Sequence, residues 1–392
     1  MATSPTLRSE RVPAATPRQR RAKSLTPTLF PLPGDSHTAD RCVPTPPPGL
    51  RWRRDAAKAP SGIARLAASS PLVDEKRDTE YFLLPVKSIL NRCDSARVPF
   101  RWTVNPYRGC EFGCRYCYAR YTHEFMELDG AEFERKIYVK ENAGPLAARD
   151  LAFDDVEGEH IAIGTATDPY QPAEKEFGAT RAILEKMAER EGLSVSITTK
   201  SNQVVRDVDL LRRIAEKSSL SVNISITTLR ARLARLLEPR APRPDLRMDA
   251  VRKLREAGID AGVFAMPILP GLNDREEELD ALARAASDAG ALWFAGSVLF
   301  LMPSALKIFL PFVQEKFPKL ADRYRAWYAR NAYAPEAYRK EVAGRFEGLR
   351  KKYGLASRGY APAAAARSSP QLSLGLVAIS PAVKVVQSCA TG

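Results

Sequence analysis

The sequence predicts an α/β protein built on a parallel sheet, and two observations carry that prediction. Short runs rich in Val, Ile and Leu alternate with longer amphipathic segments through the middle of the chain, which is the pattern of repeated strand–helix units. Hydroxyl, charged or Gly/Pro residues gather directly after the apolar runs, where parallel α/β folds place their sites. The six units suit either an incomplete barrel or an open doubly wound sheet.

The first predicted strand, residues 98–104, alternates in polarity and leads into a loop with three cysteines. The other strands are expected at residues 161–167, 193–199, 221–228, 259–266 and 292–299. Helices with apolar residues at helical spacing are expected between them at residues 174–191, 203–217, 246–257 and 275–289. Three further helical stretches follow Pro303, at residues 305–317, 320–331 and 335–353.

The chain divides by composition into four parts. Residues 1–79 form a Pro/Arg-rich leader that we expect to be disordered, since the first 60 residues hold eleven of the thirty prolines. The core domain is expected at residues 80–300, a C-terminal helical extension at 301–354 and a disordered tail at 355–392. An organellar transit peptide is a second interpretation of the leader, and a start codon placed too far upstream is a third.

The formal net charge is +14, which favours an anionic partner such as nucleic acid. Half of the excess lies in residues 1–60, which carry eleven Lys/Arg against four Asp/Glu, so an arginine-rich leader alone accounts for much of it. A mean hydropathy of −0.29 and the lack of long apolar runs argue against a membrane protein. The six cysteines are too scattered for a disulfide framework, which suits a reducing, cytoplasmic setting.

Cys110, Cys114 and Cys117 form a CxxxCxxC motif interleaved with aromatic residues. Ferredoxin-type clusters usually take four cysteines and structural zinc sites take four ligands, yet no cysteine follows Cys117 before Cys389. Three thiolates can hold three irons of a 4Fe-4S cluster and leave the fourth iron open, and S-adenosylmethionine could chelate that iron through its amino and carboxylate groups. A zinc site completed by His123 is the alternative.

This motif, with Tyr116 before its last cysteine, resembles that of the radical SAM superfamily. Further motifs narrow the resemblance to its spore photoproduct lyase-like branch. They span about half of the chain and read NPYRGCxxxCxYCYAR at 105–120, TDPYQPxE at 167–174, TTKS at 198–201, SITT at 225–228, LEP at 237–239 and PILPGLND at 267–274.

The resemblance implies a partial (β/α)6 TIM-type barrel and a radical SAM enzyme. Such an enzyme cleaves S-adenosylmethionine reductively to a 5′-deoxyadenosyl radical, with electrons from a donor such as flavodoxin or ferredoxin. Lys200 is expected to pair with the cofactor carboxylate, and Glu238 either orders its loop by salt bridges or reaches the cofactor. The implied cluster ligands are Cys110, Cys114 and Cys117, and the implied cofactor-binding residues are Tyr116, Thr167, Lys200 and Ser225.

One position departs from the lyase pattern. The lyase returns a hydrogen to its product from a cysteine, and Thr165 stands where that cysteine would align. A hydroxyl O–H bond is too strong for this role, so lyase activity on the thymine dimer of spores is in doubt unless a tyrosine or a tail cysteine substitutes.

Two features outside the barrel bear on the substrate. The segment Gln371–Leu376 (QLSLGL) resembles the short peptide with which bacterial proteins dock on the replication sliding clamp. Arg and aromatic residues in the last two predicted helices suit either a nucleic-acid platform or an ordinary core-facing stripe. We therefore expect a radical enzyme acting on DNA or RNA, by lesion repair or base modification. The alternatives are a small-molecule or peptide substrate and a non-enzymatic metal-binding module.

Overall fold

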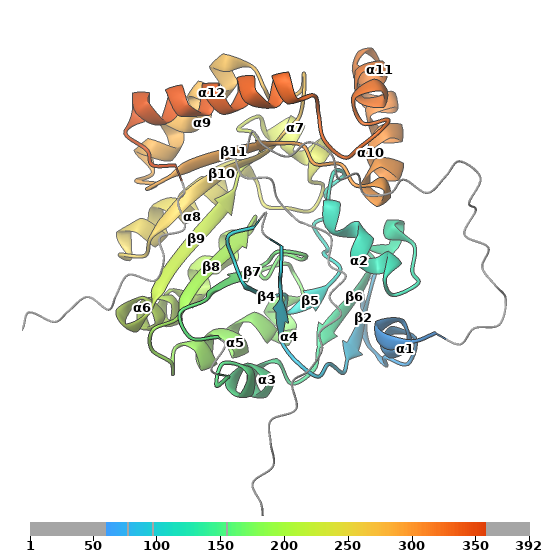
Figure 1. Cartoon of the computed structure of the whole chain (residues 1–392), viewed down its shortest axis with the longest axis vertical. Helices are drawn as coiled ribbons and strands as arrows, with labels where there is room; N and C mark the ends of the chain where they lie inside the picture. Colours follow the sequence, from blue (N-terminus) through green and yellow to red (C-terminus); the bar gives the residue numbers. More distant parts are fainter. Residues whose placement is uncertain (1–59, 77, 96–97, 154–155, 358–392) are drawn as a thin grey trace, which may run out of the picture.

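The main feature of the fold is a seven-stranded sheet with the order β11-β10-β9-β8-β7-β4-β3 (Figure 1). The computed structural model describes residues 60–357 except 77, 96–97 and 154–155. From β4 to β11 each strand of this sheet runs parallel to the next one along the chain, and β3 adds an antiparallel edge. The bounds are Leu90–Arg92 (β3), Trp102–Val104 (β4), His160–Ile163 (β7), Ser194–Thr199 (β8), Ser219–Ser225 (β9), Ala261–Ile268 (β10) and Phe294–Val298 (β11).

The strand order decides between an incomplete barrel and an open doubly wound sheet, the two architectures that alternating strands and helices allow. A doubly wound sheet reverses its strand order part-way, whereas this order follows the chain from β4 to β11 without a reversal. Among the described strands β3 and β11 remain the two ends of the sheet. The sheet is therefore an incomplete barrel, with all six predicted strands present.

Helices follow the strands as predicted, but two of them are broken. The segment predicted as one helix at residues 174–191 forms α4 and α5, because Gly178 lies between them with a φ of +59°. The segment at residues 203–217 begins as the 3-10 turn η4 before α6, and α7 was not predicted. The bounds are Glu174–Phe177 (α4), Ala179–Met187 (α5), Asn202–Asp207 (η4), Val208–Lys217 (α6), Ala231–Leu237 (α7), Pro244–Glu256 (α8) and Glu276–Asp288 (α9).

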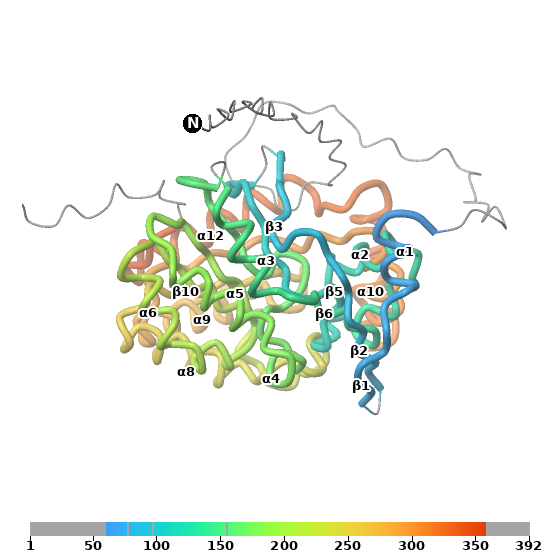
Figure 2. The backbone as a smooth tube through the Cα atoms, turned by 90° about the horizontal axis from the view of Figure 1, so that it is seen from below, coloured from blue at the N-terminus to red at the C-terminus, as the bar shows by residue number. Residues whose placement is uncertain are grey.

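A second, four-stranded sheet with the order β1-β2-β6-β5 was not predicted. Its strands are Leu72–Lys76 (β1), Thr79–Leu84 (β2), Lys136–Lys140 (β6) and Tyr107–Arg108 (β5), and the helices beside them are Gly62–Ala68 (α1), Tyr121–Glu124 (α2) and Ala143–Asp150 (α3). Figures 1 and 2 both place β5 and β6 next to α2. Since α1 and β1 fall in the segment predicted to be disordered, that prediction is wrong for residues 62–76; residues 1–59 lie outside the described part.

Three helices follow the barrel as predicted: Pro303–Lys316 (α10), Pro318–Trp327 (α11) and Glu336–Tyr353 (α12). α12 packs on β11, where the Phe346 ring stacks on Phe294 at 5.0 Å between centroids. A Cβ at Gly296 would lie 2.0 Å from Phe346 Cζ, so only glycine lets the ring approach the strand this closely. After α12, Ala356 N donates to Leu292 O (2.9 Å) and Phe294 N donates to Ala356 O (3.1 Å).

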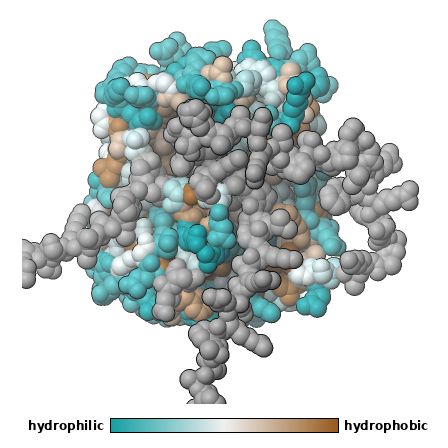
Figure 3. All heavy atoms as spheres, viewed as in Figure 1, coloured by the Kyte–Doolittle hydropathy of each residue, from teal (hydrophilic) through white to brown (hydrophobic). Residues whose placement is uncertain are grey.

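The upper face in Figure 3, formed over α9 and α12, is mostly hydrophilic. Within the described residues, every helix is too short or too polar to cross a bilayer. Residues 358–392, with the Gln371–Leu376 segment and Cys389, lie outside the described part.

Candidate functional site

The cysteine loop leaves β5 and is covered by the C-terminal helices. Cys110 and Cys114 are buried and Cys117 is half-buried. The loop packs in one apolar cluster with Phe309 and Val313 of α10. Its backbone is anchored at both ends, because Cys110 N donates to Phe133 O (3.0 Å) and Arg115 N to Leu237 O (2.9 Å).

The three thiols lie in surroundings that oppose a free thiolate. Burial raises the pKa of all three, and nearby carboxylates and thiolates raise those of Cys110 and Cys114 further. Such groups ionise when a metal supplies the missing positive charge. Among the described residues no three His, Cys, Asp or Glu side chains are already spaced for a single metal ion. A soft, three-thiol donor set on one loop fits an iron–sulfur cluster rather than a hard divalent cation.

His123 does not accompany these cysteines. It is fully buried, its ring packs edge-on against Phe133 and Tyr138, and its Nε2 lies 3.0 Å from Lys136 O. The histidine that a four-ligand zinc site needs is therefore engaged elsewhere.

Thr167 and Gln171 hold the start of the cysteine loop. Thr167 Oγ1 donates to Gly109 O (2.6 Å), and Gln171 Nε2 donates to the same oxygen (3.2 Å). Gln171 Oε1 accepts from Glu111 N (2.9 Å). The segment after β7 thus fixes the loop, and the Thr167 hydroxyl, predicted as a cofactor contact, donates its proton to the protein itself.

Gly109 makes this close approach possible. Its φ is +85°, and a Cβ there would lie 2.6 Å from Lys136 O and 2.8 Å from Phe133 O. Both neighbours are backbone atoms and cannot move aside cheaply.

Asp168 joins the ends of β7 and β8. Its carboxylate is buried and accepts from Tyr170 N (2.9 Å), Thr199 Oγ1 (2.6 Å) and Lys200 N (2.7 Å). Burial raises the pKa of Asp168, although these three donors favour its ionised form. The hydrogen bond from Lys200 N to Asp168 fixes the backbone position of Lys200.

Glu238 is the centre of the other side of the site. Its carboxylate lies 2.6 Å from Arg247 Nη2 and 3.8 Å from Lys200 Nζ, and it accepts from Thr227 Oγ1 (2.6 Å) and from Tyr116 OH. Burial opposes its ionisation, but Arg247 and then Lys200 outweigh burial and lower the pKa of Glu238 to about 2. The structure therefore brings Tyr116 and Lys200 together on Glu238, which orders this region by salt bridges.

Ser225 and Thr165 occupy the ends of β9 and β7. Ser225 is buried, and its carbonyl accepts from Arg247 Nη1 (3.1 Å). Thr165 Oγ1 accepts from Asn105 Nδ2 (3.0 Å), while Thr165 O accepts from Tyr118 OH. Thr165, the position that departs from the lyase pattern, thus contacts one residue before the three cysteines and one residue after them.

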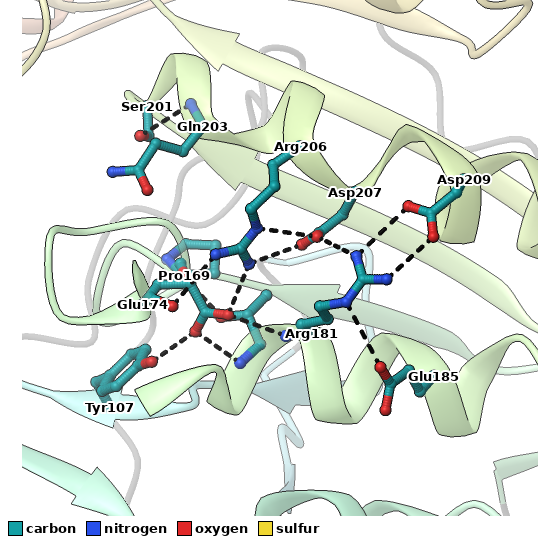
Figure 4. Close-up of polar contacts among 11 residues, drawn as sticks. Tyr107, Pro169, Glu174, Arg181, Glu185, Ser201, Gln203, Arg206, Asp207 and Asp209 are labelled. Atoms are coloured by element: carbon teal, nitrogen blue, oxygen red, sulfur yellow. Dashed lines mark hydrogen bonds and ion pairs between the residues drawn. The ribbon is translucent and has the colours of Figure 1, made fainter. Parts of the chain in front are cut away.

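The segment after β7 is anchored on its outer side as well (Figure 4). Glu174 accepts from Tyr107 OH (2.5 Å) and Thr180 N (2.8 Å) and pairs with Arg206 Nη2 (3.0 Å). Arg206 and Arg181 both pair with the buried Asp207, at 3.0 and 2.7 Å. This network connects η4 to the segment that holds the cysteine loop.

Comparison with known proteins identifies the family. The Radical SAM superfamily model matches residues 104–283. An uncharacterised protein of Mycobacterium tuberculosis is 36% identical over 272 residues, which cover 69% of this chain and 80% of the relative. The chain belongs to the radical SAM superfamily. A protein of Methanocaldococcus jannaschii is 35% identical over 176 residues, 45% of this chain and 63% of the relative.

The radical SAM fold here is that of the spore photoproduct lyase branch. The structure of a point mutant of spore photoproduct lyase has a TM-score of 0.54 at 16% identity, covering 70% of this chain and 79% of that one. The lyase complexed with dinucleoside spore photoproduct gives 0.53 at 17%, covering 69% and 79%. At this identity the likeness concerns the fold.

Sequence reasoning missed three residues of this radical SAM site. Three residues were not named as site residues: Asp168, Arg247 and Glu111. Each is buried and holds in place a loop that carries a predicted site residue. Glu111 accepts from Tyr81 OH (2.9 Å) and Ala173 N (2.6 Å). For Asp168 and Glu111 the available signal was that a charged residue inside a motif is costly to bury unless it is paired, whereas Arg247 lies outside every motif.

Proposed function

We propose that the protein uses a 4Fe-4S cluster and S-adenosylmethionine to start a radical reaction on nucleic acid. The observation that supports this most is the buried cysteine loop, which Thr167 binds at Gly109 O and Glu238 binds at Tyr116 OH, beside the ends of β7 and β8 that Asp168 joins. Membership of the radical SAM superfamily supports the cofactors.

In this proposal Cys110, Cys114 and Cys117 hold the cluster. When bound, the cluster and S-adenosylmethionine supply a 5′-deoxyadenosyl radical that abstracts a hydrogen. Lys200 is the cation that can pair with the cofactor carboxylate. Its ion pair with Glu238 is long at 3.8 Å, and Glu238 would keep Arg247 as a partner at 2.6 Å. Tyr116 shapes the loop through Glu238.

Thr167 and Ser225 act at the strand ends beside the cofactor. The Thr167 hydroxyl donates to Gly109 O and accepts from Gln171 Nε2 (3.1 Å), so one oxygen lone pair remains to accept a bond from the cofactor amine. Ser225 lies beside the Arg247–Glu238 pair. Both contacts remain predictions.

The substrate class rests on charge and analogy. The net charge of +14 favours a polyanion, and a solved structure of the lyase with the same fold is complexed with dinucleoside spore photoproduct. Because Thr165 replaces the hydrogen-donating cysteine, we propose a repair or base-modifying reaction that ends differently from that of the lyase. A small-molecule or peptide substrate is the alternative, and would be indicated if no DNA or RNA changes turnover.

The cellular compartment and the electron donor are proposed from the free cysteines and from the electron that the reaction needs. The described cysteines are unpaired, which suits the cytoplasm, and a low-potential donor such as flavodoxin or ferredoxin would supply the electron. Sliding-clamp docking through Gln371–Leu376 stays a prediction.

Anaerobic reconstitution tests the proposal. Wild type should take up iron and sulfide and release 5′-deoxyadenosine when reduced with dithionite. Cys114→Ala should lose both properties, and Cys93→Ala, a buried cysteine outside the loop, should keep them. Zinc in place of iron, or equal nucleoside from wild type and Cys114→Ala, would rule the proposal out. Deuterium transfer from a labelled oligonucleotide into 5′-deoxyadenosine then identifies the substrate.

A further inference from the structure

Two cations lie on one face of the second sheet without a polar partner among the described residues. Arg108 of β5 is opposite Tyr138 of β6 in the register, and Lys140 is two residues further along β6. Residues at such diagonal positions have side chains on the same face about 7–8 Å apart. Both long side chains can therefore reach one common ligand.

Lys140 is only 4% exposed, and no described residue forms a hydrogen bond or ion pair with its ammonium group. Arg108 Nε is also buried without a hydrogen-bond partner. The carboxylate whose charge acts on Lys140 is that of Asp150, but it already accepts from Ser88 Oγ (2.7 Å) and Ile89 N (2.7 Å) and pairs with Arg149. Burial and then Arg108 lower the pKa of Lys140 to about 7.

Unpaired buried cations are rare because desolvation opposes them. A buried cation without a counter-charge is a candidate site for an anion from outside the chain. Tyr121 of α2 is buried, which raises the pKa of its hydroxyl, and the charge of Arg108 partly offsets this rise. We call the three side chains of Arg108, Lys140 and Tyr121 together the cationic recess.

The cationic recess adjoins the candidate site. Arg108 lies two residues before Cys110, and Tyr121 lies four residues after Cys117. Tyr121 also packs in one cluster with Tyr118, whose hydroxyl contacts Thr165. An anion in the recess would lie on the side of the loop where the departure from the lyase pattern occurs.

We infer that the cationic recess binds a backbone phosphate of the nucleic-acid substrate and so sets which nucleotide faces the cluster loop. This inference rests on the proposed function for the nature of the substrate. A phosphodiester suits the recess because it offers two oxygens, one for the guanidinium fork and one for the ammonium.

The first test measures binding of a fluorescently labelled single-stranded 12-mer to the full-length chain, without iron or S-adenosylmethionine, over a range of salt concentrations. Lys140→Met should bind about tenfold more weakly, as expected for one charged hydrogen bond. Its slope of log affinity against log salt should fall by about 0.7. Lys186→Met, which removes an equal charge from α5 where Lys186 pairs with Glu189 at 2.7 Å, should bind within twofold of wild type.

The second test places one neutral methylphosphonate linkage at each position of the 12-mer in turn. One position should weaken binding to wild type about tenfold and have no further effect on Lys140→Met, because both changes remove the same contact. Additive losses, or unchanged binding by Lys140→Met, would overturn the inference. Inorganic phosphate that raises the melting temperature of wild type but not of Lys140→Met, while the 12-mer does not compete, would identify a free phosphate site and also overturn it.

Folding controls keep the result interpretable. Methionine matches the lysine stem and removes an unpaired buried charge, so Lys140→Met should melt no lower than wild type. Lys140→Arg, which keeps the cation, should restore binding to within about threefold. If Lys140→Met folds poorly, Lys140→Gln carries the same comparison. Since this assay needs no cofactor, a chain that binds through Lys140 but makes no 5′-deoxyadenosine contradicts only the proposed function.

Discussion

At the scale of single residues, buried charges hold the loops of the site in place. Asp168 and Glu111 accept backbone N–H groups from neighbouring segments, and Glu238 pairs with Arg247 while it accepts from two hydroxyl groups. Each of these contacts joins segments that are separate in the sequence. Their loss should therefore affect both stability and the positions of the site residues.

Glu238→Gln should destabilise the fold by about 3–5 kcal/mol, because it leaves Arg247 buried without its counter-charge. Urea unfolding of the cluster-free chain at pH 7 measures this. Glu256→Gln is the matched control, since Glu256 forms an exposed pair with Arg252 on the same helix as Arg247, and should not change stability measurably. Equal effects of the two substitutions would contradict the role of Glu238.

His123 should make stability depend on pH in a defined window. Burial lowers its pKa to about 4 from 6.5, so between these values the unfolded chain binds a proton that the folded chain does not. Unfolding free energy should fall as pH drops from 6.5 to 4, by about 3 kcal/mol from this group. His123→Phe should lose less stability over that window in urea titrations. Parallel curves for the two proteins would show that His123 is already protonated in the fold.

At residue scale the sequence predicted which residues gather but not what they bond. The cysteines, Thr167, Lys200 and Ser225 were named from motifs, and the structure places them at adjacent strand ends. That the Thr167 hydroxyl donates to Gly109 O, and that Tyr116 meets Lys200 on Glu238, depends on contacts between segments 38 to 122 residues apart. No local pattern encodes such pairings.

At the scale of elements, the barrel strands were predictable and the second sheet was not. Buried parallel strands are near-continuous apolar runs, as in β10 (AGVFAMPI), whereas β8 and β9 alternate Ser, Thr or Asn with Val, Leu or Ile, which is also a strand pattern. β5 has two residues and pairs with β6 about thirty positions later, and β1 carries Asp74, Glu75 and Lys76 on an exposed edge. Such short, polar strands have no periodicity to detect. Gly178 also ended a helix where the apolar pattern continued.

Gly109→Ala should disturb the cysteine loop. The added Cβ would meet two backbone carbonyls within 3 Å at a φ of +85°, so we expect a loss above about 2 kcal/mol and reduced iron uptake. Calorimetry and iron content measure the two effects. Gly344→Ala is the control, because a Cβ there meets nothing within 4 Å in α12; it should be neutral or stabilising by up to about 1 kcal/mol. A Gly109→Ala protein with normal stability and iron content would contradict this account of the loop.

At the scale of the whole molecule, the barrel and its C-terminal helices form one packed unit. Phe346 and Leu349 of α12 belong to the same apolar core as β8 to β11, and α10 and α11 share a core with the cysteine loop. The sequence indicated the three helices, but their amphipathic pattern could not show that they cover the site.

Phe346→Ala should therefore destabilise the entire chain by about 3–5 kcal/mol and leave a single unfolding transition. Calorimetry with fluorescence as a second probe checks both points. Phe153→Ala, at an exposed phenylalanine, should cost less than about 1 kcal/mol. Separate melting of α12 before the barrel would show that the extension is an independent unit.

The short segment after α12 has a consequence for solubility. Ala356 occupies backbone groups along the outer side of β11, which is one end of an unclosed sheet. A bare strand at such an end is a template on which a second molecule can add its own strand. A chain shortened to end at Gly354 would keep every proposed site residue, yet should scatter more light on concentration than one ending at Arg358. These few residues thus help to keep separate copies of the protein apart.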